Sequence, residues 1–388
     1  MKAAIITLYH NNINCGGILQ AYALYKYLEN NGIDVEQITY EKRLNVADVR
    51  FGARLRRFLK NRPISAVKKI MNYFKMKLNY IPVDEEEMKA RRTAFQHFMC
   101  EIIQHSDKIY NQDSVRECVN DYDVFITGSD QVWNFAWYDS VYFLDFVDGK
   151  QKKKFSYAAS FSMKELTDAQ KLIVSDSLKD YEAISVREQD AVSLLDGLTN
   201  RTVEYVVDPT LLLKQEEWNE VCAESVVDEE YVFGYFLGSN IDVVRKAVEF
   251  AHKRNFKFVM IPFASGNYNM KEDGLADIRI VDAAPEKFLS LIKNAQYVFT
   301  DSFHAVVFSF IYQKQFFVFN RDKKESMNSR IFSITELLGL EERFCNSKKK
   351  ESLEYIEGLQ EIDYTVPFEK FEELRARSVK FLEQIISN

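Results

Sequence analysis

Two hydrophobic patterns alternate along the chain. Short runs of β-branched and aromatic residues, which are typical of buried strands, are followed by segments with apolar residues at helical spacing. The first run spans 3–8, and the next segment places Ile18, Tyr22 and Tyr25 at helical spacing before Gly32 ends the pattern. Regular strand–helix alternation is typical of parallel βαβ units, so the pattern predicts an α/β fold with parallel sheets.

The strand-like runs fall into two groups, and a chain of 388 residues is long enough for two domains. We expect a Rossmann-like N-terminal domain over 1–208, a Rossmann-like C-terminal domain over 209–365, and a C-terminal helix over 366–388 that returns to the first domain. Two open sheets that face one another place their strand ends, and hence the functional site, in the cleft between them. The predicted strands lie at 3–8, 34–40, 123–127, 154–159, 183–187, 203–207, 231–237, 257–262, 297–300 and 316–319.

The alternation stops over about 44–120, where amphipathic patterns at 51–59 and 63–74 predict a helical insertion. Twelve Lys and Arg stand against one acid between Lys42 and Lys77, although the net charge of the whole chain is −7. A solvated helical face is one interpretation of this basic segment. The other is peripheral contact of 42–77 with an anionic membrane or a lipid diphosphate. The acidic remainder of the chain argues against nucleic acid as a partner.

Five cysteines are scattered without a CxxC pair, so neither a disulfide framework nor a zinc site is expected. The first residues, MKAAIITLYHNN, are too short and too polar for a signal peptide. No apolar run approaches the roughly 20 residues that span a bilayer. We therefore expect a soluble cytoplasmic protein, located at the inner face of the membrane if the basic segment binds lipid.

Polar loops follow two of the strands in the first group. Gly16 and Gly17 precede a helix, where backbone N–H groups can approach an anion, although a plain turn gives the same pattern. The second loop, at 128–134, reads GSDQVWN directly after a buried strand. Asp130 could accept a proton from a sugar hydroxyl and Trp133 could stack on a pyranose ring. The alternative is a helix cap with Trp133 in the core.

Two further loops carry a cation or a histidine. Arg187 ends an apolar strand, where it can hold a carboxylate or phosphate with two hydrogen bonds. The alternative is an ion pair with Glu188 or Asp190. His304 lies in the first turn of a segment that is apolar all round, and its alternative role is structural. A general-acid role would require a bound phosphate or carboxylate nearby to keep the ring protonated.

Five motifs together make the chain similar to polysaccharide pyruvyl transferases, from Lys2 to about Leu340. This resemblance implies a GT-B-like fold of two Rossmann-like domains around a cleft. It implies phosphoenolpyruvate as donor, without a metal or other cofactor. The acceptor would be a sugar diol of a polysaccharide or of its lipid-linked precursor, converted to a pyruvyl ketal in capsule or exopolysaccharide synthesis. The motifs are GGILQAYAL (16–24), GSDQVWN (128–134), SVRE (185–188), VVDPTLLL (206–213) and TDSFHA (300–305).

The resemblance also implies roles for individual residues. His304 would be the acid or a phosphate ligand, and Asp130 would orient or deprotonate the acceptor. Ser302 stands where the family often has an arginine, so Arg321 or Arg330 would replace that cation, or the donor differs. The predicted donor-binding residues are Arg187, Ser302, Arg321, Arg330, Gly16 and Gly17. The predicted acceptor-binding residues are Asn11, Asn12, Ser129, Gln131, Trp133 and Asn134.

Two other functions are compatible with these residues. A GT-B glycosyltransferase would use a nucleotide sugar and would need a base-binding pocket, for example near 263–269. A non-catalytic sugar-binding homologue would have lost its donor site, and Ser302 is the feature that suggests it.

Overall fold

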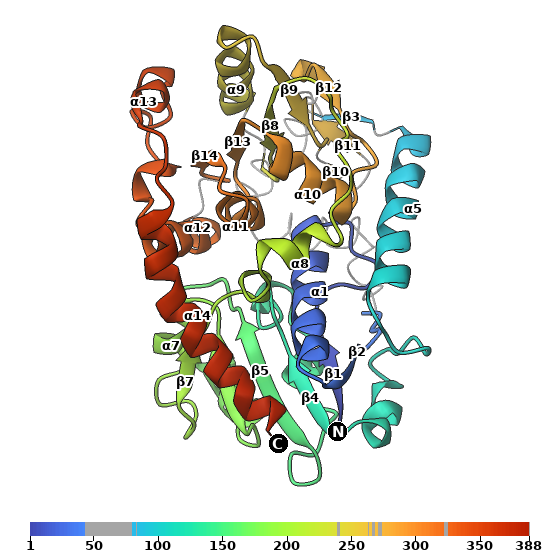
Figure 1. Ribbon diagram of the computed structural model, residues 1–388. Helices are drawn as coiled ribbons and strands as arrows, with labels where there is room; N and C mark the ends of the chain where they lie inside the picture. The colour runs from blue at the N-terminus through green and yellow to red at the C-terminus, as the bar shows by residue number, and fades with distance from the viewer. Residues whose placement is uncertain are drawn as a thin grey trace, which may run out of the picture.

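Two six-stranded parallel sheets, each flanked by helices, form the protein (Figure 1). The computed structural model describes residues 1–42, 80–82, 84–238, 241–262, 264–265, 268–270, 274–321 and 325–387. The helical patterns expected at 51–59 and 63–74 lie outside these residues, as does the basic segment 42–77 apart from Lys42. The predicted α/β class with two Rossmann-like sheets is confirmed.

The first sheet has the strand order β2-β1-β4-β5-β6-β7. Helix α1 (Cys15–Asn30) connects β1 to β2 on one side, and the chain then returns to β4 on the other side of β1. Such a reversal leaves a crevice at the carboxyl ends of the two strands, where ligands bind in open α/β sheets. The strands are β1 (Lys2–Ile6), β2 (Asp34–Gln37), β4 (Val124–Thr127), β5 (Lys153–Ala159), β6 (Ala183–Val186) and β7 (Val203–Tyr205).

The second sheet repeats this plan with the order β12-β9-β8-β13-β14-β15. Its strand order reverses between β8 and β13, so it has a crevice of its own. Its strands are β8 (Tyr231–Tyr235), β9 (Lys257–Met260), β12 (Ile278–Arg279), β13 (Tyr297–Thr300), β14 (Gln315–Phe319) and β15 (Phe344–Cys345).

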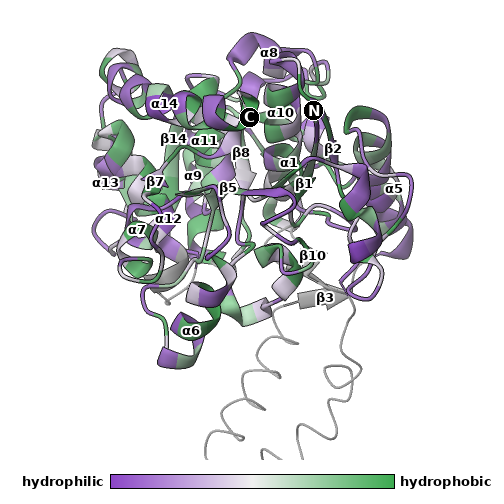
Figure 2. Cartoon of the chain, turned by 90° about the horizontal axis from the view of Figure 1, so that it is seen from below, coloured by the Kyte–Doolittle hydropathy of each residue, from purple (hydrophilic) through white to green (hydrophobic). Residues whose placement is uncertain are grey.

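The helices around the second sheet differ in how deeply they lie. All nine residues of α11 are buried, because the segment is apolar apart from His304 and Ser309. Figure 2 shows hydrophobic residues along α10 and α11 in the interior of the molecule. The helices of this half are α9 (Ile241–Lys253), α10 (Pro285–Asn294), α11 (Phe303–Ile311), α12 (Glu325–Leu338) and α13 (Leu353–Gly358).

A small antiparallel sheet of order β10-β11-β3 joins distant parts of the chain, pairing β3 (Tyr80–Pro82) with β11 (Tyr268–Met270). Strand β10 (Ala264–Ser265) completes it. Helix α5 (Glu85–Ile102) follows, and its Arg91 donates a hydrogen bond to the carbonyl of Pro262 at 2.7 Å. The segment after β2 is therefore attached to the second half of the chain.

The last helix, α14 (Thr365–Ile386), contacts both halves and runs along one side of the molecule in Figure 1. Ser378 Oγ accepts a hydrogen bond from the backbone N–H of Val207, just after β7 of the first sheet, at 2.9 Å. Toward the other end, the ring of Phe371 packs on Phe310 of α11. None of the helices in the described part of the chain is long and apolar enough to span a membrane. The remaining elements are α6 (Asp168–Ser177), α7 (Gln189–Leu194), α8 (Gln215–Asn219), and the 3-10 turns η1 (Val115–Asp121), η2 (Phe135–Trp137), η3 (Ser140–Phe143), η4 (Pro209–Leu211) and η6 (Glu341–Arg343).

Candidate functional site

A cluster of buried charges lies where the two sheets face one another. Asp130, Arg187 and Asp208 follow strands β4, β6 and β7 of the first sheet, and His304 follows β13 of the second. Arg330, from α12, completes the cluster with Nη1 lying 3.6 Å from Oδ1 of Asp130. The site therefore combines residues that lie up to 200 positions apart in the sequence.

Arg187 is the centre of this cluster. Its Nη1 donates to Oδ2 of Asp208 at 2.8 Å, and its Nη2 donates to Oδ1 of Asp130 at 3.1 Å. Its Nε lies 3.5 Å from Oε1 of Glu188. The ion pair with Glu188, which the sequence analysis gave as the alternative to binding a ligand, is therefore present. Burial opposes the charge of Arg187, but the three carboxylates raise its pKa above the usual arginine value. With 2% of its side chain exposed, Arg187 orients carboxylates of the protein, and a donor would have to displace one of them to reach it.

Asp208 is fully buried and is the acidic partner of His304. Its Oδ2 lies 3.7 Å from Nε2 of His304, and its Oδ1 accepts hydrogen bonds from the hydroxyl and amide of Thr210 at 2.7 and 3.0 Å. Burial alone would raise the pKa of this carboxyl, but His304, Arg187 and Thr210 hold it well below its usual range. Sequence reasoning did not select Asp208 as a site residue. The available signal was an acid in the otherwise apolar motif VVDPTLLL, directly after a strand.

His304 packs against the N-terminus of α1. Its Nε2 is buried without a hydrogen-bond partner, and a Cβ added to Gly16 would lie 2.1 Å from Nδ1 of the ring. Gly16 is therefore required for the close approach of the imidazole. The amides of Gly16 and Gly17 donate to Oδ1 of Asn14 at 3.0 and 3.3 Å. The prediction that these amides face a bound anion was wrong, because Asn14 caps them.

Arg330 is a buried cation with little compensating charge. Burial and the neighbouring charge of Arg187 lower its pKa to about 10. It shares Asp130 with Arg187, and its Nε is buried without a hydrogen-bond partner. With the amide of Gln131 oriented so that its oxygen faces Arg330, that oxygen lies 3.1 Å from Nη1 and 2.9 Å from Nη2. The partners of the guanidinium are therefore a neutral amide and a carboxylate that also pairs with Arg187. A bound anion would balance the rest of its positive charge.

Asp130 is the most accessible acid of the cluster, with 16% of its side chain exposed. Burial raises the pKa of its carboxyl, but Arg187, Arg330 and His304 together hold it below the usual aspartate value. The group is therefore ionised at neutral pH. It is suited to accept a hydrogen bond from a hydroxyl and to orient it, rather than to act as a strong base.

Arg321 and Ser302 lie at the edge of the cluster. Nη2 of Arg321 donates to the carbonyl of Asp301 at 3.3 Å, and the carboxylate of Asp301 accepts hydrogen bonds from the amides of Leu237 and Gly238, both at 2.7 Å. Ser302 is buried at the N-cap position of α11, and its hydroxyl does not cap that helix. The amides of the first turn of α11 are thus left without a side-chain cap beside His304.

Two of the predicted acceptor-binding residues lie in the core. Trp133 is fully buried, its ring stacks on Phe143 with centroids 5.3 Å apart, and its Nε1 donates to the carbonyl of Tyr142 at 3.1 Å. Ser129 is also fully buried and donates to the carbonyl of Ala158 at 2.9 Å. The prediction that these two side chains contact a sugar was wrong, because neither reaches the surface.

The other predicted acceptor residues shape two loops. Oδ1 of Asn134 accepts a hydrogen bond from the amide of Ala136 at 2.9 Å and caps η2. Asn12 stabilises the first loop by donating to the carbonyl of Leu8 at 2.8 Å. Asn11 is exposed, and Gln131 is partly exposed beside Arg330. Contact of these residues with an acceptor stays a prediction.

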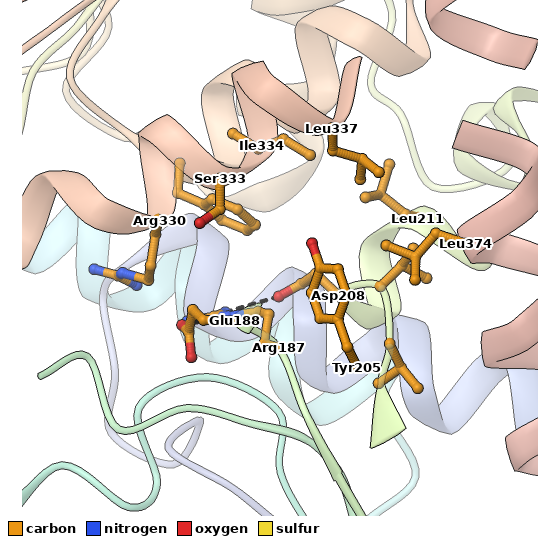
Figure 3. Close-up of a pocket in the computed structure, with 13 residues that line it drawn as sticks. Arg187, Glu188, Tyr205, Asp208, Leu211, Arg330, Ser333, Ile334, Leu337 and Leu374 are labelled. Atoms are coloured by element: carbon orange, nitrogen blue, oxygen red, sulfur yellow. Dashed lines mark hydrogen bonds and ion pairs between the residues drawn. The ribbon is translucent and has the colours of Figure 1, made fainter. Parts of the chain in front are cut away.

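A small cavity separates α12 from the strand ends of the first sheet. Figure 3 shows Arg330 and Ser333 of α12 on one side and Arg187, Glu188 and Asp208 on the other. Its volume of about 20 Å³ holds roughly one water molecule. This cavity alone is therefore too small for a donor of several heavy atoms. Within the described ranges, no group of three His, Cys, Asp or Glu side chains is arranged to hold a metal ion.

Comparison with known proteins agrees with this architecture. A model of the family described as polysaccharide pyruvyl transferase matches residues 14–323. Among solved structures, UDP-N-acetylglucosamine 2-epimerase from Rickettsia bellii is 9% identical with a TM-score of 0.55, covering 100% of this chain and 96% of that one. The Neisseria meningitidis UDP-GlcNAc 2-epimerase bound to UDP-GlcNAc (12% identity, TM-score 0.50) covers 100% of both chains. Arabidopsis thaliana UGT89C1 (10% identity, TM-score 0.50) covers 100% of this chain and 98% of its own. At these identities the likeness shows the GT-B fold alone. No curated protein matches the sequence.

Proposed function

Because the chain belongs to the polysaccharide pyruvyl transferase family, we propose that it transfers the pyruvyl group of phosphoenolpyruvate to a sugar diol as a ketal. The acceptor would be a polysaccharide or its lipid-linked precursor. The confirmed resemblance in sequence and the GT-B fold support the class of reaction. The buried nitrogens of Arg330 and His304 that lack hydrogen-bond partners support phosphoenolpyruvate as the donor.

The observation that carries this proposal is a pair of incompletely partnered groups on the second half of the chain. Nε of Arg330 and Nε2 of His304 are both buried without hydrogen-bond partners, and Arg330 shares its acid with Arg187. The uncapped first turn of α11 lies next to them. Phosphoenolpyruvate carries a phosphate and a carboxylate within a few bonds, so it offers negative charge to a cation and to helix amides at the same time.

The residues divide the chemistry as follows. His304, which faces the carboxylate of Asp208, donates a proton to C3 of the enol phosphate. A hydroxyl of the acceptor, oriented by Asp130, attacks C2, which has become oxocarbenium-like, and the bond between C2 and the phosphate oxygen breaks to release inorganic phosphate. One hydroxyl proton replaces the proton that His304 gave to C3, and the other leaves on the phosphate. The second hydroxyl closes the ketal. One phosphoenolpyruvate and one diol thus give one ketal and one phosphate, with no oxidant or reductant.

A nucleotide-sugar donor is the alternative at the same site. At the reversal point between β8 and β13, the carboxylate of Asp301 accepts hydrogen bonds from the amides of Leu237 and Gly238. The amides of the first turn of α11 have no side-chain cap, so they would be open to the phosphate of either donor. Thermal-shift titrations with UDP, GDP and phosphoenolpyruvate compare the two donors directly. Stabilisation by a nucleoside diphosphate alone would favour a glycosyltransferase.

The proposal is tested by transfer itself. We expect phosphate release from phosphoenolpyruvate that depends on an added hexopyranoside, with a matching mass gain of one pyruvyl group on the sugar. His304→Gln should abolish both signals, and Leu172→Ala, a change at a residue 74% exposed on α6, should leave them unchanged. Binding of phosphoenolpyruvate without transfer to any sugar diol would contradict the proposed reaction.

A further inference from the structure

A pair of aromatic side chains is exposed beside the charged cluster. Trp137 is 42% exposed and Tyr138 is 39% exposed, although both are large and largely apolar. Trp133 and Trp218, the other two tryptophans of the chain, are fully buried. An exposed tryptophan next to polar groups is a feature of binding surfaces, because its ring offers a large contact area together with an N–H donor.

The backbone under these rings is held in place before any ligand binds. Asn134 caps the short η2 turn, and Nε1 of Trp137 donates to the carbonyl of Gln131 at 3.2 Å. Nζ of Lys42 donates to the carbonyls of Trp137 and Tyr138, at 2.5 and 3.2 Å. The ring of Tyr138 stacks on Phe135 with an interplanar angle of 4°. A ligand that binds here therefore orders few side chains, which lowers the entropic cost of binding.

The exposed pair is continuous with the candidate site. The carbonyl that accepts the indole N–H belongs to Gln131, whose side-chain amide faces Arg330 and whose preceding residue is Asp130. One hydrogen bond and one residue thus separate the Trp137 ring from the carboxylate that would orient an acceptor hydroxyl. A ligand ring on Trp137 would therefore lie near the loop that carries Asp130.

We propose that Trp137 and Tyr138 form the platform on which the pyranose ring of the acceptor stacks, with its diol directed toward Asp130. Pyranoses suit this surface because the axial C–H groups make one face of the ring apolar while the hydroxyls point outward from its edge. The platform takes the role that the sequence suggested for the buried Trp133. The inference rests on the proposed function for the identity of the ligand, but its first test, by fluorescence, does not require the reaction to occur.

The fluorescence of the native protein provides the test. Because two of the three tryptophans are buried, quenching by iodide reports mainly on Trp137. We expect methyl β-D-glucopyranoside, methyl β-D-galactopyranoside or methyl α-D-mannopyranoside to protect this component from iodide. Sorbitol, which has hydroxyls but no ring face, should not protect it. Trp137→Phe should remove the iodide-sensitive component and thereby confirm its assignment.

Kinetics with the best pyranoside then separates stacking from a structural role. Trp137→Ala should raise the KM for the sugar about 10-fold or more, as expected for loss of an anchoring tryptophan. The thermal shift caused by phosphoenolpyruvate should stay unchanged, and Trp137→Phe should recover most of the loss. If no pyranoside protects the wild-type protein from iodide, with or without saturating phosphoenolpyruvate, the platform is overturned. An unchanged sugar KM in Trp137→Ala would overturn it as well.

Failure of the platform and failure of the pyruvyl transfer give different results. Protection by pyranosides without any transfer from phosphoenolpyruvate would leave the platform standing and remove the reaction. Transfer that proceeds equally well in Trp137→Ala would leave the reaction standing and remove the platform.

Discussion

Nε2 of His304 lies 3.7 Å from Oδ2 of Asp208, and the two side chains belong to opposite halves of the molecule. Asp208 also accepts hydrogen bonds from Arg187 and Thr210, so residues of its own half hold its carboxylate in place. The carboxylate that faces the proposed acid therefore comes from the other half of the molecule.

Asp208→Asn should destabilise the protein by about 3–5 kcal/mol at neutral pH, because it removes one acid from the fully buried Arg187. The folded pKa of Asp208 lies below its unfolded value, so its contribution to stability is complete above pH ~4. That contribution is lost as the pH falls through the folded pKa.

The stability difference between the wild-type protein and Asp208→Asn should therefore shrink below pH ~4. Urea unfolding at pH 7 and at lower pH measures this, and Asp228→Asn, at an exposed position, is the control. A difference that stays constant down to pH ~3 would contradict the assignment.

Gly16→Ala should disable the site without unfolding the protein. The added Cβ would lie 2.1 Å from Nδ1 of His304, so the ring must move away from Asp208. We expect transfer activity to fall about 100-fold, as for a misplacement of roughly 1 Å. The clash should also lower the free energy of unfolding. In a His304→Ala background, the same change should cost no further unfolding free energy, because the clash is gone. Gly358→Ala, where a Cβ meets no neighbour within 4 Å, is the matched control. If the two changes lower the unfolding free energy additively in the double variant, a direct clash with His304 is refuted.

Arg330→Gln should weaken phosphoenolpyruvate binding. Loss of a charge-assisted hydrogen bond costs about 1.5–3 kcal/mol, which corresponds to roughly a 10- to 150-fold higher Kd. Calorimetric titration measures the change, and Arg245→Gln, at an exposed position, serves as the comparison. An unchanged Kd would exclude Arg330 as a donor ligand and would direct attention to Arg321.

Ser378→Ala tests the attachment of α14. The change removes the acceptor of the Val207 amide hydrogen bond and leaves that N–H buried and unpaired. We expect a loss of about 1–3 kcal/mol in unfolding free energy. Thermal and urea unfolding measure it, with the exposed Ser193→Ala as control. A loss no larger than that of the control would mean that α14 contributes little through this bond.

Much of the fold follows from local patterns. The apolar runs at 123–127 and 297–300 coincide with β4 (Val124–Thr127) and β13 (Tyr297–Thr300), because strands buried on both faces must be apolar throughout. The order of the strands in the sheet, in contrast, cannot be read from local patterns. The position of β1 between β2 and β4 depends on pairing between residues more than 120 positions apart, and no local pattern encodes it.

The site was predictable as a set of loops but not as a set of contacts. An indole after a strand has the same sequence context whether it points to the core, as Trp133 does, or to solvent, as Trp137 does. Arg187 gains its three acids from its sequence neighbour and from residues 130 and 208. Its ion pairs with these two distant carboxylates exist only once the sheet has formed, so they could not be read from the spacing of the motifs.

The charges of the cluster divide by sign between the two halves. The first half contributes Arg187 against Asp130, Glu188 and Asp208, whereas the second contributes Arg321 and Arg330 against Asp301. The halves thus present faces of opposite sign, which attract one another. An anionic donor would compete with the acids of the first half for the cations of the second. Its binding would therefore weaken the attraction between the halves, and release of phosphate would restore it.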